Sequence, residues 1–199
     1  YGMTYRFGPL QVSCCWFAAV IASLIGLATG PLADWISHRS TIMNGGIREP
    51  EMRLPAVLPS LLTAPLGLVL YGAGIHYRLH WIVPTLGIAF SSFTIVSGTV
   101  VALVYAVDSY KPITEEIVTC VLGYNALFGF LIAFYTNEWV GNEGYLRSFG
   151  EMGSISAAAF LFVIPLWIWG KRVRQASLTW SVFRLVQWHA DRDDLVLEE

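Results

Sequence analysis

Five long stretches of this sequence contain almost no charged residue. Counting Asp, Glu, Lys, Arg and His, Asp34 ends the first stretch, and no charge falls within any of the five. Each stretch is about 19 to 27 residues long, and a helix needs roughly 20 residues to cross the hydrocarbon core of a bilayer. The pattern predicts an all-α integral membrane protein with five transmembrane helices. The expected spans are residues 9–33, 54–75, 81–107, 117–137 and 153–170.

Composition argues against a soluble domain. The chain has 199 residues, which one soluble domain could have, but only 13% of them are charged, against about 25% in an ordinary globular protein. One apolar run could form a buried core helix, whereas five in succession exceed what a small soluble protein can bury. We therefore expect the lipid bilayer as the partner of these helices, and no nucleic acid.

Basic residues orient the predicted spans, because cytoplasmic segments of membrane proteins are enriched in Lys and Arg. The segments 34–53, 108–116 and the chain after 170 fall on one side of the membrane and hold nine Lys and Arg, whereas the other side holds three. We expect a multi-pass protein of the plasma membrane with its N-terminus outside. Its tail, 175–199, would be cytoplasmic, either as an amphipathic helix on the membrane surface or as a disordered segment.

The first residue of the chain is Tyr1 rather than Met, and an apolar stretch follows almost at once. An odd number of spans with an outside start is also unusual for a complete polytopic protein. These features predict that the sequence is a fragment of a protein with further helices upstream.

Ionisable residues inside spans are the usual functional candidates in membrane proteins, but only Asp34, at the end of a span, qualifies here. Polar uncharged residues come next. Tyr124 and Asn125 are the best candidates for lining a substrate cavity, because an amide deep in hydrocarbon needs a hydrogen-bond partner. A hydrogen bond from Asn125 to a neighbouring helix is an equally good explanation.

Helix packing has its own pattern. Small residues recur every four positions along the first span, which lets helix backbones approach closely in lipid. Hydroxyl residues in the third span, Ser91, Ser92 and Thr94, are expected to bond to their own helix. The small residues of the first span are Ala18, Ala22, Gly26 and Gly30.

Patterns for covalent or metal chemistry are weak. His76 and His80 have an H-x-x-x-H spacing, but a membrane di-iron site needs several histidine pairs and the chain has 4 His in all. The 3 cysteines form neither a disulfide framework nor a zinc pattern. We expect no metal, no cofactor and no enzymatic activity.

The stretch GPLADWISHR at 30–39 resembles the signature loop of the major facilitator superfamily, G-x-L-A-D-R-x-G-R-[RK]. Two further stretches, NGGIREPEMRL at 44–54 and YAVDSY at 105–110, resemble the carboxy-terminal half of fungal members, in the branch of drug–proton antiporters and polyamine-type carriers. The loop positions that match are Gly30, Leu32, Ala33, Asp34 and Arg39, and those that depart are Trp35, Ser37 and His38.

This resemblance implies a fold and a function. The spans would be helices eight to twelve of a secondary transporter, and residues 1–174 would form most of its C-terminal bundle. The N-terminal helical bundle would be the missing partner. Transport would follow alternating access, with proton coupling and a small-molecule substrate such as a drug or a polyamine.

The resemblance also implies a gating role for the charged link, because the family's loop makes charge contacts that hold the two halves together in one conformation. Asp34 would lie at the cytoplasmic end of a helix, where its charge opposes the helix macrodipole, so it needs a cationic partner. Arg39 or Arg53 could be that partner. The expected gating residues are Gly30, Asp34, Arg39 and Arg53.

Simpler interpretations stay open. For Arg48, Glu49, Glu51 and Lys111, helix capping and membrane orientation are the favoured roles. A non-transporting membrane subunit, or a nonfunctional truncated product, is the alternative to a transporter.

Overall fold

The computed structural model describes residues 5–46, 49–109 and 114–178. In this part of the chain every regular element is helical, which confirms the all-α prediction. In chain order the elements are α2 (Pro9–Leu27), α3 (Thr29–Met43), the 3-10 helix η1 (Pro50–Val57), α4 (Leu58–His76), α5 (Ile82–Ser109), α6 (Thr114–Glu143), α7 (Tyr145–Leu161) and α8 (Val163–Leu178).

Five helical units are long and apolar enough to cross a membrane, as predicted. They are Pro9–Met43, Pro50–His76, Ile82–Ser109, Thr114–Glu143 and Tyr145–Gly170. The chain is therefore an integral, multi-pass membrane protein. The first unit joins α2 to α3, and the last joins α7 to the start of α8. Residues 175–178 of the predicted tail are the end of α8, and 179–199 lie outside the described residues.

The helices are longer than the apolar runs that predicted them. The predicted span ended at residue 33, which placed Asp34 and Arg39 in a loop. Helix α3 instead continues to Met43, so both residues lie within a helix. The reason is that charge marks where an apolar surface ends, whereas backbone geometry ends a helix. Here the helix ends just before Gly45 and Gly46, whose φ angles of 69° and 88° are left-handed, a conformation that glycine adopts readily after a helix.

Two prolines explain where the long units break. Pro31 is the third residue of α3, and Pro165 is the third residue of α8. Proline has no amide hydrogen, so the carbonyl four residues earlier loses its helical partner. Those carbonyls belong to Leu27 and Leu161, the last residues of α2 and α7.

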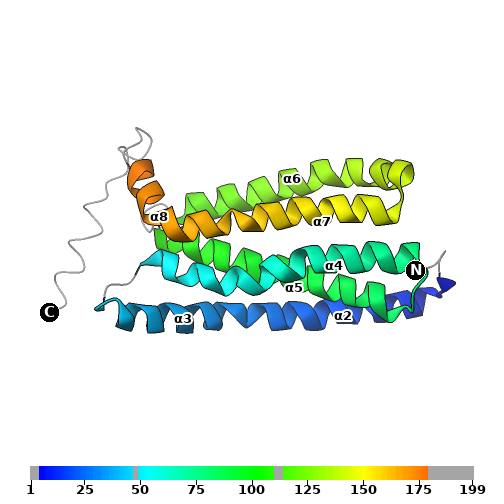
Figure 1. The fold of residues 1–199 in the computed structure, drawn as a ribbon, viewed down its shortest axis with the longest axis horizontal. Coiled ribbons are helices and arrows are strands. Elements are labelled where there is room, and N and C mark those ends of the chain that lie inside the picture. Colours follow the sequence, from blue (N-terminus) through cyan, green and yellow to red (C-terminus); the bar gives the residue numbers. More distant parts are fainter. Residues whose placement is uncertain (1–4, 47–48, 110–113, 179–199) are drawn as a thin grey trace.

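Helix α4 lies at the centre of the bundle, between α5 and α7, and α2 packs along α5 (Figure 1). Glycines allow the α4–α5 approach: a Cβ added at Gly67 would lie 2.7 Å from Ser91 Oγ, and one at Gly74 would lie 2.7 Å from Pro84 Cδ. Any larger side chain at these positions would push the two helices apart. This seam makes α4 and α5 a tightly joined pair.

The small residues of the first span have the packing role that their spacing predicted. Ala22 and Gly26 are buried, and a Cβ at Gly26 would lie 3.1 Å from Val96 Cβ on α5. Gly30 continues this contact, since a Cβ there would lie 3.4 Å from Val100 Cγ1.

The hydrophobic core lies at one end of the bundle. Ala33, Ala56, Val57 and Val101 are buried together, with Ile36, Phe160 and Val163 packed against them. These residues come from α3, η1, α5, α7 and α8. The 3-10 helix η1 therefore sits where four other elements meet.

Helix α6 differs from the others because none of its residues, Thr114–Glu143, is buried. It lies along one edge of the bundle beside α7 (Figure 1). Gly123, Gly129 and Gly141 have no atom within 4 Å of an added Cβ. The exposed face is strongly apolar, as expected of a helix that contacts lipid or other helices.

Candidate functional site

The principal polar site is an arginine between two carboxylates. Arg53 on η1 places Nη2 2.8 Å from Asp34 Oδ1 on α3, and Nη1 3.3 Å from Asp108 Oδ2 near the end of α5. The Arg53 side chain is 9% exposed, against 26% for Asp108 and 63% for Asp34. We call these three residues the Arg53 network. It ties together three elements that are far apart in sequence.

The surrounding fold fixes the Arg53 network. Arg53 precedes the buried residues Leu54, Ala56 and Val57, so the packing of η1 sets the position of the guanidinium. Among the described residues, its Nε has no hydrogen-bond partner. A buried arginine is costly unless acceptors compensate it, and here two carboxylates do so at the other two nitrogens.

The structure therefore selects between the two cations that the sequence offered for Asp34. Arg53 makes the ion pair, whereas the Arg39 guanidinium carbon lies 5.6 Å from the centre of the Trp35 ring, at a distance typical of a cation–π contact. Gly30 lies against α5 and contributes close packing, not charge. Sequence reasoning did not predict that Asp108 pairs with Arg53, although the stretch YAVDSY that contains it was the available signal.

Tyr124 and Asn125 on α6 lie apart from the Arg53 network. Asn125 lines an open groove of about 650 Å³ between α5, α6 and α7, together with Thr94, Thr99, Tyr105 and Ser156. Tyr124 is 65% exposed and stacks on Phe128, with ring centres 5.8 Å apart, and it is not among the groove residues. The two neighbours therefore have different surroundings.

Two hydroxyl pairs join α4 to α5, and sequence reasoning missed both. Ser60 and Ser97 share a short hydrogen bond, and both are fully buried. Thr63 Oγ1 lies 2.7 Å from Thr94 Oγ1. The expectation that Thr94 bonds to its own helix is therefore wrong, because the close approach at the glycine seam brings a hydroxyl of α4 within reach.

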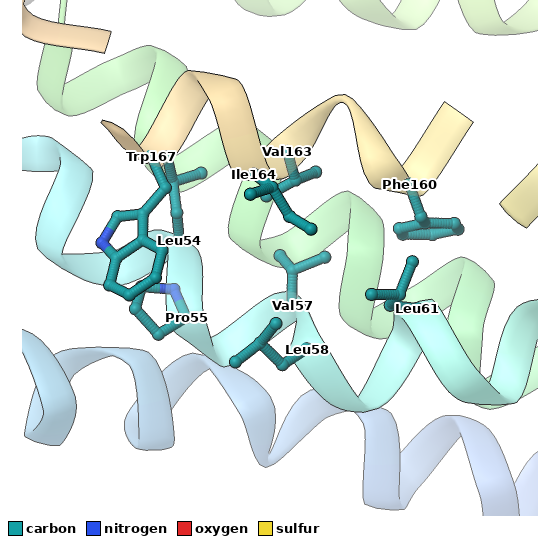
Figure 2. Close-up of a pocket in the computed structure, with 9 residues that line it drawn as sticks. All are labelled: Leu54, Pro55, Val57, Leu58, Leu61, Phe160, Val163, Ile164 and Trp167. Atoms are coloured by element: carbon teal, nitrogen blue, oxygen red, sulfur yellow. The ribbon is translucent and has the colours of Figure 1, made fainter. Parts of the chain in front are cut away.

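An apolar pocket lies beside the Arg53 network, between η1, the start of α4, and the α7–α8 unit. Figure 2 shows Trp167 and Leu54 at one end of this pocket and Phe160 and Leu61 at the other. Its volume is about 20 Å³, close to that of a single water-sized probe. It is a packing gap between helices and not a substrate chamber.

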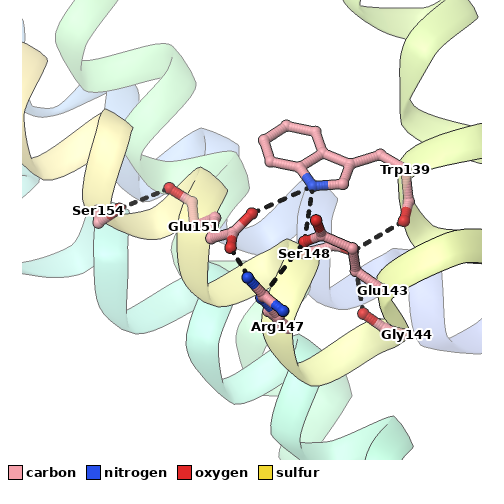
Figure 3. Close-up of polar contacts among 7 residues, drawn as sticks. All are labelled: Trp139, Glu143, Gly144, Arg147, Ser148, Glu151 and Ser154. Atoms are coloured by element: carbon pink, nitrogen blue, oxygen red, sulfur yellow. Dashed lines mark hydrogen bonds and ion pairs between the residues drawn. The ribbon is translucent and has the colours of Figure 1, made fainter.

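The opposite end of the bundle carries a second charge cluster, in the turn between α6 and α7 (Figure 3). Arg147 Nε lies 3.1 Å from Glu151 Oε1 and 3.6 Å from Glu143 Oε2. The indole Nε1 of Trp139 donates to Glu143 Oε2 and to Glu151 Oε2 at 3.2 and 3.1 Å. We call these four residues the Arg147 cluster. Gly144, with φ 79°, makes the sharp turn.

At the same end, Tyr5 binds the turn between α4 and α5. The Tyr5 hydroxyl lies 3.0 Å from the Gly74 carbonyl oxygen and 2.6 Å from that of Leu79, and donates to both acceptors. A phenol is protonated at neutral pH, and burial raises the pKa of Tyr5 further, so the hydroxyl remains a donor. The turn between α4 and α5 is thereby held.

Metal-binding groups do not gather within the described ranges: no set of three or more His, Cys, Asp and Glu side chains is placed to hold an ion. Cys14 and Cys120 are exposed, Cys15 is buried, and all three thiols are free.

The chain is similar to fungal transporters along most of its length. It is 26% identical to the MFS-type transporter penM of Penicillium rubens over 85% of this chain, and 29% identical to a probable efflux pump, mfs2, of Aspergillus flavus over 73%. A probable drug/proton antiporter of Saccharomyces cerevisiae, YHK8, is 24% identical over 87%. The chain is therefore similar to fungal members of the major facilitator superfamily. The resemblance drawn from 30–39, 44–54 and 105–110 is thus confirmed at the level of the family.

Coverage of these superfamily relatives is partial. The chain spans about a third of their length, 34% of each of the three proteins named. No protein-family model and no solved structure matches the chain. The superfamily relatives are transporters and not enzymes, which agrees with the expectation of no covalent chemistry.

Proposed function

We propose that this chain forms most of the C-terminal bundle of a secondary transporter that works by alternating access. The observation that carries this proposal is the similarity to named transporters along most of the chain, joined to five helical units able to span a membrane. On this proposal they are helices eight to twelve, and an N-terminal bundle supplies the other wall of the pathway.

The Arg53 network is the proposed gate. Arg53 is anchored in the core, whereas Asp34 is 63% exposed, so Asp34 is the partner that can separate without exposing the arginine. A gate needs two arrangements whose populations a ligand can shift. In one arrangement Asp34 pairs with Arg53; in the other α3 moves away and Asp108 keeps the arginine compensated. Gly30 would allow α3 to stay close to α5, and Arg39 would contact a neighbouring charge after release from Trp35.

Asn125 is the proposed substrate contact in the groove between α5, α6 and α7. Its amide both donates and accepts, and the nearby hydroxyls of Thr99, Tyr105 and Ser156 line the same groove. Tyr124, on the exposed side of α6, would contact the N-terminal bundle or a substrate held between the bundles. A small organic molecule, such as a drug or a polyamine, fits a surface that is mostly apolar with a few hydrogen-bonding groups.

Proton coupling and orientation complete the proposal. A proton gradient is proposed because one relative is named as a drug/proton antiporter. The Arg53 network would face the cytoplasm and the Arg147 cluster the outside of a plasma membrane, in agreement with the nine and three Lys and Arg expected on the two sides.

Transport by the protein expressed in a strain lacking its own efflux carriers tests this proposal. A panel of drugs, polyamines and vitamins is offered with and without an imposed proton gradient. We expect export of at least one compound, reduced at least tenfold by Asp34→Asn at unchanged surface expression. The matched control is Glu116→Gln, an exposed carboxylate on α6. Equal transport by Asp34→Asn and the control would remove the gating role.

A further inference from the structure

Glu51 is a buried carboxylate at the charged end of the bundle. It lies on η1, two residues before Arg53, and is 5% exposed. Both of its carboxylate oxygens are enclosed by protein. Since helix capping and membrane orientation require only exposed charge, burial of this kind indicates a different role.

The space around Glu51 is shaped by a glycine on the last helix. Gly170 on α8 is buried, and a Cβ added there would lie 2.9 Å from Glu51 Cγ. The same Cβ would lie 3.3 Å from the Tyr105 hydroxyl oxygen on α5 and 3.4 Å from Glu51 Oε1. Contacts below 3 Å between carbon atoms do not occur without a shift of one partner. Gly170 and Tyr105 therefore form a fitted seat for Glu51.

Glu51 and Arg53 face different helices from one short element. Glu51 lies against Gly170 of α8, whereas Arg53 pairs with Asp34 of α3 and Asp108 of α5. A 3-10 helix has about three residues per turn, so residues two apart point in different directions. Pro50 and Pro55 lie in the same element and restrict its backbone. A displacement of Glu51 is therefore transmitted to Arg53.

We propose that Glu51 is a positioning residue for Arg53. Its carboxylate, held in the seat formed by Gly170 and Tyr105, fixes η1 at the place where Arg53 reaches both Asp34 and Asp108. The position of α8 and the integrity of the Arg53 network are then coupled. The unit Tyr145–Gly170 thereby influences the Arg53 network, whose three residues lie on α3, η1 and α5.

A double-mutant cycle on thermal stability tests this coupling in the purified protein in detergent. The variants are Glu51→Gln, Asp108→Asn and the pair. If Glu51 positions Arg53, then Asp108 is worth less once Glu51 is changed, so the loss of Tm in the double variant is clearly smaller than the sum of the single losses. Glu116→Gln paired with Asp108→Asn is the control, and its losses should add. Additive losses for Glu51→Gln and Asp108→Asn would overturn the proposal.

A second cycle tests the seat itself. Gly170→Ala should lower the Tm by several degrees in the wild-type background, and by much less beside Glu51→Ala, which removes the Cγ that it meets. Gly150→Ala, at a glycine of α7 with no atom within 4 Å of an added Cβ, is the matched control. An equal loss from Gly170→Ala in both backgrounds would show that Glu51 does not occupy this seat. Both cycles measure stability alone, so they stand whether or not the protein transports a given compound.

Discussion

The two ends of the bundle each hold an arginine between two carboxylates, but the two arrangements differ in burial. Arg53 is 9% exposed and Arg147 is 71% exposed. The Arg53 network joins three separate elements beside the hydrophobic core, whereas the Arg147 cluster joins α6 to α7 across a single turn. Similar chemistry therefore has different consequences. If Arg53 loses a carboxylate partner, water cannot readily take its place, whereas water can solvate the exposed Arg147.

The difference in burial also decides which of the two charge clusters constrains how the helices pack. A buried arginine needs its acceptors at fixed places, so the Arg53 network constrains how α3, η1 and α5 meet. Exposed ion pairs contribute little to stability and are screened by salt. The α6–α7 turn is instead fixed by Gly144 and by Ser148, whose buried hydroxyl donates to the Gly144 carbonyl oxygen at 2.9 Å.

The largest effect should come from Arg53→Met. Removal of the guanidinium leaves Asp34 and Asp108 facing each other without a cation, and methionine preserves only the aliphatic bulk. We expect a loss of about 3 kcal/mol, the lower end of the range for breaking a buried ion pair, measured as the free energy of unfolding in detergent. Arg172→Met, at an exposed arginine of α8, is the control. Equal losses from the two variants would show that the Arg53 network does not stabilise the fold.

A smaller effect should distinguish the two carboxylates of the same network. Asp108→Asn should cost about 1–2 kcal/mol, between the values for exposed and for buried ion pairs, because the pair with the enclosed Arg53 is lost. Asp34→Asn should cost less, since the Asp34 side chain is 63% exposed and water already weakens its ion pair with Arg53. Chemical denaturation of both variants measures the difference. The reverse order would mean that α3, and not α5, anchors the arginine.

At the other end, Ser148→Ala should cost about 1 kcal/mol. The serine is fully buried and its hydroxyl also lies 3.3 Å from the Trp139 carbonyl oxygen. Alanine therefore removes a hydrogen-bond donor from the carbonyl oxygens of Trp139 and Gly144. Thermal melting measures the loss, with Ser154→Ala as control, because Ser154 is exposed and its hydroxyl donates to the Glu151 carbonyl oxygen of the same helix. Identical melting of the two variants would show that the buried hydroxyl does not hold the turn.

The smallest effect should come from Arg147→Met. Its guanidinium is exposed, so we expect no measurable change of Tm at physiological salt and only a slight loss at low salt. A loss comparable to that of Arg53→Met would abolish the contrast between the two ends.

The sequence predicted the membrane class, the five spans and the family, because apolar runs of bilayer length and a signature at 30–39 are local patterns. It did not predict that Asp34 lies within a helix, since a polar residue can continue a helix beyond the apolar surface. Nor did it predict the Thr63–Thr94 bond, the burial of Glu51 or the role of Asp108. Each of these depends on how closely two distant segments approach, and glycines such as Gly67 and Gly170 set that distance without leaving a hydropathy signal.

The first helical unit, α2 joined to α3, has a further consequence through its length. Its 35 residues rise about 52 Å at roughly 1.5 Å per residue, whereas the hydrocarbon layer is about 30 Å thick. Even when tilted, this rod must project by more than one helical turn into water, and its polar half from Asp34 onward is the part that projects. Asp34 lies three residues after Pro31 and Met43 lies twelve residues after it, so a bend at Pro31 would move Met43 much farther than Asp34.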